Sequence, residues 1–185
     1  MTLPTDTDHS MLKRLQLANQ LMDLAEPRRA AVQAWFDAHW DAIASAPGSS
    51  SNHQTWPGGF LDHTLQLLQT AERLFATLPD IHPLPTGIDL DAAKTVLLFH
   101  DVEKPFKYTT GLPAGWDKQR YLTHDLAQHW GITFSSIEIN ALTYVHGEGD
   151  DYRKGVRVMN PLAAFVHSCD ILSARVWFDR GAPGA

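Results

Sequence analysis

The chain has little cysteine, little positive charge and no long apolar run. Among its 185 residues Cys169 is the single cysteine, which excludes an intrachain disulfide and fits a reducing compartment. No apolar stretch approaches the ~20 residues that a membrane-spanning helix needs. The residues before Ser10 lack the basic and apolar regions of a signal peptide. We therefore expect a cytoplasmic protein with no membrane partner.

Acidic residues outnumber basic ones by 21 to 15, and the formal net charge is -6. A long nucleic acid is bound by clustered lysine and arginine side chains, so this balance disfavours an extended nucleic-acid surface. A small phosphorylated ligand, such as a nucleotide, needs only a few cations and remains compatible with the charge. Homo-oligomerisation is also compatible with this composition.

Helical signals recur along the whole chain, and no run of period two predicts a strand. Hydrophobic residues make up 44% of the chain, enough for one core of ordinary domain size. The expected helices cover residues 11–25, 27–46, 60–78, 90–104, 118–130, 136–146 and 162–178. We therefore predict an all-α, single-domain bundle of about seven helices. Within it, the helices of residues 1–50 pack on a unit that spans residues 50–180.

Polar metal donors recur at intervals of about one helix plus one loop. An apolar helical run delivers the neighbouring pair His100 and Asp101, and further donors follow or precede it at spacings of 22 to 37 residues. One donor per helix is how a helical bundle builds a metal site in its core. The candidate ligands are His63, His100, Asp101, His124, His146 and Asp170.

Four histidines and two carboxylates are too many for one tetrahedral zinc and suit two ions that share a carboxylate. The hypothesis places Asp101 between the ions, with His63, His100 and Asp170 on the first. His124 and His146 complete the second, although His129 and Asp125 compete with His124. The donors favour a divalent transition metal, namely manganese, iron, nickel, cobalt or zinc, over magnesium. Two ions ~3.5–4 Å apart activate water for attack on phosphorus.

Other polar residues lie close to these donors in the sequence. Lys104 follows Asp101 by three residues, so it is a candidate phosphate-binding and catalytic cation, or else a lysine that interacts with the helix dipole. His53, Arg153 and Lys154 are candidate substrate contacts, although each also suits an ordinary solvated loop. His167 precedes Asp170 by three residues and is expected to support a ligand rather than to be one.

Three short motifs contain the proposed ligands. They are His53-x-x-Trp56-x-Gly58-Gly59-x-Leu61-x-His63-Thr64, Leu98-x-His100-Asp101-x-x-Lys104, and Asp170-Ile171-Leu172-Ser173-Ala174-Arg175. The first is similar to the segment that opens the HD domain of certain 3′–5′ exoribonucleases, and the second to the common form L-x-H-D-x-x-K. The third resembles the D-x-x-S-A-x-R motif of ribonuclease Y, with one residue fewer before the arginine.

Together the motifs resemble the HD-domain metal-dependent phosphohydrolase superfamily over about residues 50–180. The resemblance implies an HD-domain fold with a central metal site, in which two further histidines complete a dinuclear centre. Asp101 and Lys104 are then the catalytic residues. Glu103 departs from the pattern, because a glycine is usual there. The activity implied is hydrolysis of a phosphoester in a nucleotide or a similar small phosphorylated metabolite.

Three other functions remain open from the sequence. A 3′–5′ exonuclease or a cyclic-nucleotide phosphodiesterase is supported by the first motif. A di-iron oxygenase is an alternative because some HD-superfamily members use the same ligand set for oxygen chemistry. A nucleotide-binding module without catalysis is the non-enzyme alternative.

Overall fold

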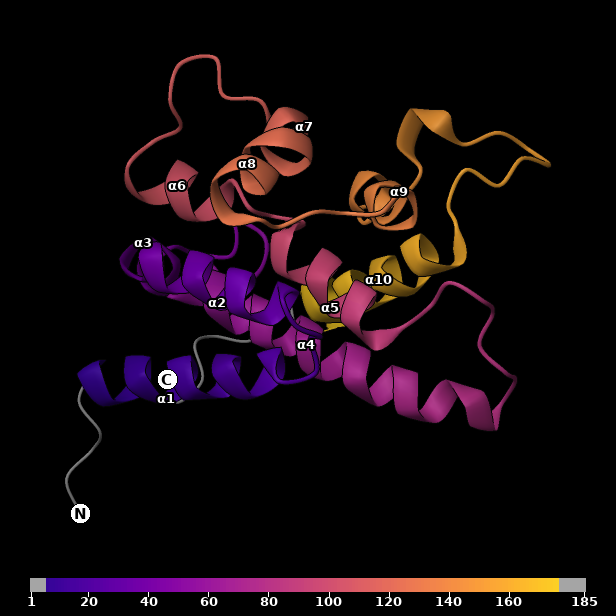
Figure 1. The fold of residues 1–185 in the computed structure, drawn as a ribbon, viewed down its shortest axis with the longest axis horizontal. Coiled ribbons are helices and arrows are strands. Elements are labelled where there is room, and N and C mark those ends of the chain that lie inside the picture. The colour runs from indigo at the N-terminus through magenta and orange to yellow at the C-terminus, as the bar shows by residue number, and fades with distance from the viewer. Residues whose placement is uncertain (1–5, 177–185) are drawn as a thin grey trace.

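The computed structural model describes residues 6–176, in which all regular secondary structure is helical (Figure 1). The α-helices are α1 (Asp6–Leu21), α2 (Arg28–Ala38), α3 (Trp40–Ser45), α4 (Gly59–Thr77), α5 (Leu90–Phe99), α6 (Lys104–Thr109), α7 (Lys118–Arg120), α8 (Leu126–Trp130), α9 (Ser136–Tyr144) and α10 (Pro161–Ile171). Short helical segments of other types are the 3-10 turns η1 (Leu78–Asp80) and η3 (Gly149–Asp151) and the π-helical η2 (Tyr121–Asp125) and η4 (Leu172–Val176). The predicted all-α class is confirmed.

Helix α5 lies at the centre of the bundle. It packs against α4, α9 and α10, while α1 and α3 cover α4 (Figure 1). Every residue of α5 from Ala92 to Phe99 is buried, as expected of a mostly apolar helix at the centre of a bundle. With only ten residues, α5 is too short to cross a bilayer, and no other helix in the described range combines the length and apolarity that a membrane crossing requires.

Side-chain caps fix where the central helices begin. The Asp89 carboxylate accepts a hydrogen bond from the Ala92 backbone N–H, and the Asn160 side chain accepts one from that of Ala163. Ser135 and Glu138 form a reciprocal capping box at the start of α9. The predicted end of the last helix, residues 177 and 178, lies outside the described residues.

Several predicted helices have different ends in the structure. The helix predicted over residues 11–25 is α1, over Asp6–Leu21, and the helix predicted over residues 136–146 ends at Tyr144. The helix predicted over residues 27–46 is broken at His39 into α2 and α3. The helix predicted over residues 90–104 ends at Phe99, and Pro105 does not terminate it. Proline instead lies in the first turn of α6, where its missing N–H has no helical partner to lose. His100 and Asp101 therefore lie in the turn between two helices.

A buried ammonium group joins α5 to the end of α1. The Lys94 side chain is fully buried, and its Nζ donates to the Gln20 side-chain oxygen at 2.8 Å and to the Asp23 carboxylate. Asp23 itself is about half exposed. Because a buried charge is stable only when it is paired, this contact holds the N-terminal helix on the central one.

We predict that Asp23→Asn lowers the free energy of unfolding by about 2 kcal/mol, because it leaves the Lys94 ammonium without its nearest counter-ion. The matched control is Asp37→Asn, which removes an exposed pair with Arg14 at 2.5 Å and should cost less than about 1 kcal/mol. Urea unfolding followed by circular dichroism measures both. Equal losses in the two variants would contradict a special role for the buried pair.

Candidate metal centre

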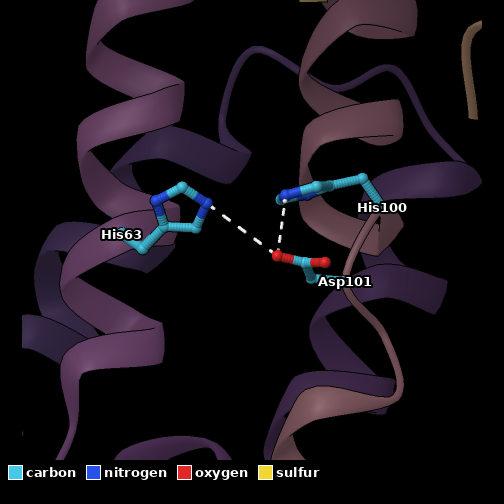
Figure 2. Close-up of side chains that lie close together, drawn as sticks. All are labelled: His63, His100 and Asp101. Atoms are coloured by element: carbon cyan, nitrogen blue, oxygen red, sulfur yellow. Dashed lines mark ion pairs between the residues drawn. The ribbon is translucent and has the colours of Figure 1, made fainter. Parts of the chain in front are cut away.

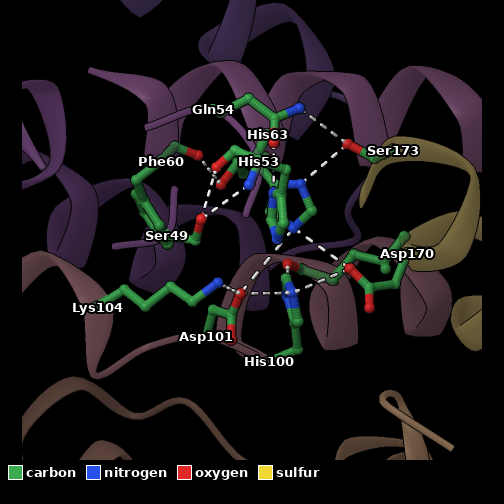
Figure 3. A network of polar contacts seen from close by, with 12 residues as sticks. Ser49, His53, Gln54, Phe60, His63, His100, Asp101, Lys104, Asp170 and Ser173 are labelled. Atoms are coloured by element: carbon green, nitrogen blue, oxygen red, sulfur yellow. Dashed lines mark hydrogen bonds and ion pairs between the residues drawn. The ribbon is translucent and has the colours of Figure 1, made fainter. Parts of the chain in front are cut away.

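Three elements bring imidazole and carboxylate groups to one buried point. His63 lies on α4, His100 and Asp101 lie in the turn after α5, and Asp170 lies near the end of α10 (Figures 2 and 3). The Asp101 Oδ2 atom is 3.0 Å from His100 Nε2 and 3.9 Å from His63 Nε2. Asp170 Oδ1 is 3.3 Å from His63 Nε2. Four of the six candidate ligands that the sequence predicts therefore meet.

Hydrogen bonds on the far side of each ring fix the orientation of two histidines. The Ser173 hydroxyl donates to Gln66 Oε1 at 2.9 Å, so its oxygen accepts from His63 Nδ1, also at 2.9 Å. His100 Nδ1 donates to the Leu97 backbone carbonyl at 2.8 Å. With the proton on Nδ1, each neutral ring presents the Nε2 lone pair to the cluster. This is the tautomer that a metal-binding histidine uses when a second group holds its other nitrogen.

The hydrogen bonding and spacing of the buried donor atoms fit a metal ion. Among the described residues, the buried His63 Nε2 and His100 Nε2 atoms have no hydrogen-bond partner, and the buried Asp101 Oδ2 atom faces them beside its ion pair with Lys104. Lone pairs that face one another at 3.0 Å repel unless a cation lies between them. Ligand atoms on a tetrahedral ion with bonds of 2.0–2.1 Å stand about 3.3 Å apart, similar to the spacings found here. His63, His100 and Asp101 could therefore hold a metal ion.

A second group of donors shares this centre. His100, His146 and Asp170 also place one donor atom each within bonding reach of a common ion. His146 follows α9, is about half exposed, and has its Nε2 atom 3.6 Å from Asp101 Oδ1. Because His100 has one Nε2 lone pair to offer, the two groups describe one centre with five residues around it. A second ion stays a prediction.

The carboxylates of the centre are held in their charged form. Burial alone would raise the pKa of Asp101, but the neighbouring His100 and Lys104 keep that pKa well below its usual range. The pKa of Asp170 is also lowered against the effect of burial, chiefly by its contact with His63. Negative charge is therefore present in the centre at neutral pH and requires a positive partner.

The two buried histidines respond to this environment in opposite directions. Burial lowers the pKa of His63 to about 4, although Asp170 and Asp101 favour its charged form. Burial also opposes charge on His100, but the pKa of His100 is raised because Asp101 lies closer to it. His63 is therefore neutral at neutral pH, with its lone pair available to an ion. His100 would have to release a proton before it could bind the same ion.

Lys104 provides a fixed positive charge beside the centre. Its Nζ atom lies 2.5 Å from Asp101 Oδ2, and its side chain is 16% exposed (Figure 3). The contact follows from position, because Lys104 stands three residues after Asp101 at the start of α6. Its ammonium group therefore lies where an anionic ligand of the centre would be bound.

The loop before α4 brings a third imidazole next to His63. The ring of His53 lies 4.8 Å from that of His63, and its Nδ1 donates to the Gln54 side-chain oxygen. The Gln54 amide nitrogen donates in turn to Gln66 Oε1 at 2.7 Å, so the same hydrogen-bonded chain orients both rings. In Figure 3, Gln54 and Ser173 lie on the opposite side of His63 from Asp101 and His100.

Close backbone packing holds this loop in place. Gln54 is buried and has a φ of 42°, an uncommon value for a residue with a side chain. A Cβ atom on Gly59 would stand 1.9 Å from the Gln54 carbonyl oxygen, so only glycine fits there. Strain of this kind gathers at functional sites, because the surrounding structure must impose it.

Some predicted site residues are not brought into the cluster. The His124 side chain is 62% exposed, and its Nδ1 atom lies 3.0 Å from Asp125 Oδ1. The physical reason is the π-helical segment η2, which turns less per residue than an α-helix and so changes the side that position 124 faces. Arg153 and Lys154 are exposed in the excursion between α9 and α10, which projects from the bundle in Figure 1.

His167 makes a different contact from the one expected. Its Nδ1 donates to the backbone carbonyl of Val145 at 2.7 Å, the residue before His146. It therefore supports the chain that carries His146 rather than a ligand side chain.

The sequence did not reveal the residues that orient the histidines. No sequence pattern points to Ser173, Gln66 or Gln54, and the contacts of Ser173 with the two glutamines join positions more than 100 residues apart. One local signal existed, since Ser173 follows Asp170 by three residues. Lys118 was also missed: its ammonium group donates to the His100 backbone carbonyl and lies 3.0 Å from Glu103 Oε2.

Comparison with known proteins adds no name to this site, because no protein family, curated protein or solved structure matches the chain.

We predict that His63→Ala and His100→Ala each lower the affinity for manganese or zinc by more than about 100-fold. Loss of a residue that only hydrogen-bonds to a ligand already lowers metal affinity by about 10- to 100-fold, and loss of the ligand itself should cost more. Isothermal titration calorimetry on protein freed of metal by chelation measures this. His124→Ala is the matched control and should bind like the unaltered protein. An equal loss in His124→Ala would instead support the ligand role predicted from the sequence. Unchanged binding in all three variants would contradict the centre.

We predict that the metal-free protein becomes less stable as the pH falls from 6.5 to 4. The folded-state pKa of His63 is about 4, below its value of 6.5 in an unfolded chain, so the unfolded state takes up the proton first in this window. The contribution of His63 amounts to about 3 kcal/mol. Asp101 and Asp170 titrate below this window in the folded protein, because their pKa values are lowered.

The measurement is urea unfolding at several pH values between 4 and 7. Burial also lowers the pKa of His39, His53 and His146, and these groups add to the same trend, whereas His100 opposes it. The comparison with His63→Leu isolates one group, because this variant should show a shallower dependence on pH. Identical slopes in the two proteins would show that His63 is not held neutral.

Proposed function

We propose that the chain is a metal-dependent phosphohydrolase of the HD type, acting on phosphoester bonds of nucleotides or similar small phosphorylated metabolites. The observation that carries the proposal is the meeting of two Nε2 lone pairs, two ionised carboxylates and one ammonium group at a buried point. A divalent ion bound there would lower the pKa of water and offset charge on phosphoryl oxygens. This chemistry needs each of those groups.

The residues of the chain would have distinct tasks in that reaction. Asp101 lies against His100 on one side and Lys104 on the other, so it keeps the imidazole ligand and the ammonium group in position. Lys104 would move its ammonium contact from Asp101 to a phosphoryl oxygen, where it stabilises charge that grows in the transition state. Burial of His63 and His100 excludes bulk water and strengthens these interactions.

The charge distribution supports a small substrate. The whole chain carries a net charge of -6, yet Lys104 and Lys118 both lie beside the His-Asp pair. Two local cations suit one phosphate group, whereas a long nucleic acid requires a continuous basic surface. The exposed Arg153 and Lys154 are the remaining candidates for contacts with the phosphate, and the structure shows no contact between them and the centre in the described residues.

The test is a panel of phosphomonoesters, phosphodiesters, nucleotides, cyclic nucleotides and short oligonucleotides, assayed with added manganese, nickel, iron or magnesium. Phosphate release from a monoester or a small diester is expected. Asp101→Asn should reduce kcat by more than about 100-fold, and Lys104→Met by about 100-fold. Lys107→Met is the matched control, because Lys107 lies on the same short helix and contacts the ring of Tyr108 instead.

Other outcomes of the panel identify the alternatives. Mononucleotides released from an oligonucleotide would identify an exonuclease. Turnover that consumes oxygen would identify an oxygenase. Nucleotide binding without turnover in any metal would identify a binding module, and each of these outcomes would overturn the phosphohydrolase proposal as stated.

A further inference from the structure

A hollow of about 260 Å³ opens beside the metal centre. It is lined from one side by α7 and η2, and from the other by α9 and His146; α7 and α9 both lie above α5 in the view of Figure 1. The lining consists of Lys118, Gln119, Leu122, Thr123, Ile139, Leu142, Thr143 and His146. Sites for drug-sized ligands occupy roughly 300–1,000 Å³, so this hollow has room for one small group.

Two residues belong both to the hollow and to the surroundings of the centre. His146 lines the hollow and has its Nε2 atom 3.6 Å from Asp101 Oδ1. Lys118 lines it too and donates to the backbone carbonyl of His100. A molecule with its phosphate at the centre would therefore have the rest of its structure at the mouth of this hollow. The larger hollow between α4 and α10, of about 720 Å³, contains none of the candidate ligands.

The walls of the hollow define the chemistry of its occupant. Leu122, Ile139 and Leu142 make one part of the wall aliphatic, while Gln119, Thr123 and Thr143 add an amide and two hydroxyl groups. The lining contains no carboxylate to bind a cation, and its one aromatic ring is the imidazole of His146, whose Nε2 atom lies toward the metal centre. The combination of aliphatic carbon and hydrogen-bonding groups suits a small polyol.

Lys118 enters the hollow with its charge already balanced. Its Nζ atom forms an ion pair with Glu103 Oε2 at 3.0 Å and donates one of its three N–H groups to the His100 carbonyl. A further N–H group is available to a hydroxyl or ester oxygen. Glu103, which stands where the resembled superfamily usually has glycine, thus serves to hold Lys118 between the centre and the hollow.

A local irregularity of the backbone marks the same wall. Leu122 and Thr123 lie in the π-helical segment η2, and π-helical turns within helices are found frequently at functional sites. The irregularity turns Leu122 into the hollow and leaves His124 exposed. The π-helical turn therefore contributes to the shape of the hollow.

We infer that this hollow binds the alcohol part of the substrate, a compact uncharged polyol of about the size of one sugar ring, as in a pentose phosphate or the pentose of a nucleotide. The inference rests on the proposed function, because it assigns the phosphate to the metal centre. Thr143 and Leu142 then limit the size of the alcohol, and Lys118 contacts the oxygen nearest to phosphorus.

Thr143→Phe tests the inference, because it fills the hollow from an exposed position. Ser168→Phe is a matched control: both hydroxyl groups are exposed, and each donates at 2.9 Å to the carbonyl four residues earlier on its helix. The probes are ribose 5-phosphate and inorganic phosphate, titrated by calorimetry into the full chain loaded with manganese. Thr143→Phe should weaken the binding of ribose 5-phosphate by at least about tenfold and leave the affinity for inorganic phosphate unchanged. Ser168→Phe should change neither affinity.

Three results would overturn the inference: ribose 5-phosphate binding to Thr143→Phe as to the unaltered protein, equal weakening of both probes, or unaltered protein that binds ribose 5-phosphate no more tightly than inorganic phosphate. The readout does not depend on turnover. Selective weakening in a protein that hydrolyses nothing would support the hollow and refute the proposed function. Hydrolysis by a protein in which Thr143→Phe weakens both probes equally would support the proposed function and refute the role of the hollow.

Discussion

A carboxylate buried inside an apolar core must have a positive charge beside it, and the Asp101 side chain imposes this requirement on its surroundings. Asp101 is 2% exposed, and Lys104 supplies one cationic contact. His63 and His100 turn their Nε2 atoms toward the same carboxylate and leave them without hydrogen bonds. The centre is therefore organised around a negative charge that one ammonium group does not fully satisfy, which is why a metal ion suits it.

The position of Asp101 depends on helix α5, which ends just before the His-Asp pair. Its start is capped by Asp89, its flank is joined to the end of α1 by Lys94, and the carbonyl of His100 just beyond its end accepts from Lys118. These contacts fix the helix along its length and around its axis. The position of the His-Asp pair thus depends on residues well away from the centre, so substitutions at those positions can alter the centre through the helix.

Much of this arrangement follows from local patterns in the sequence. Apolar periodicity and caps such as Asn160 predict the helices, and the distance of one helix plus one loop between donors predicts that His63, His100 and Asp170 approach one another. The structure brings these residues together, although ligation of a metal remains a prediction. The pattern works because each donor is close to the end of a regular helix, where the direction of a side chain can be inferred from its position.

The remainder depends on features that have no local pattern. The π-helical segment η2 shifts the side on which His124 emerges, and regular helical spacing cannot show this. Ser173 and Gln66 orient His63 through contacts between distant parts of the chain. Pro105 reads equally as the end of one helix or the beginning of the next, and packing decides between them.

The tight approach of Gly59 to the carbonyl of Gln54 has a consequence for how such a chain can diverge. Side-chain packing can adjust to a replacement through compensating changes elsewhere, but two backbone segments in contact leave nothing to exchange. We therefore expect the stretch from His53 to His63 to tolerate replacement only as one unit. A chimera that joined a foreign loop to α4 would retain His63 and still misplace it.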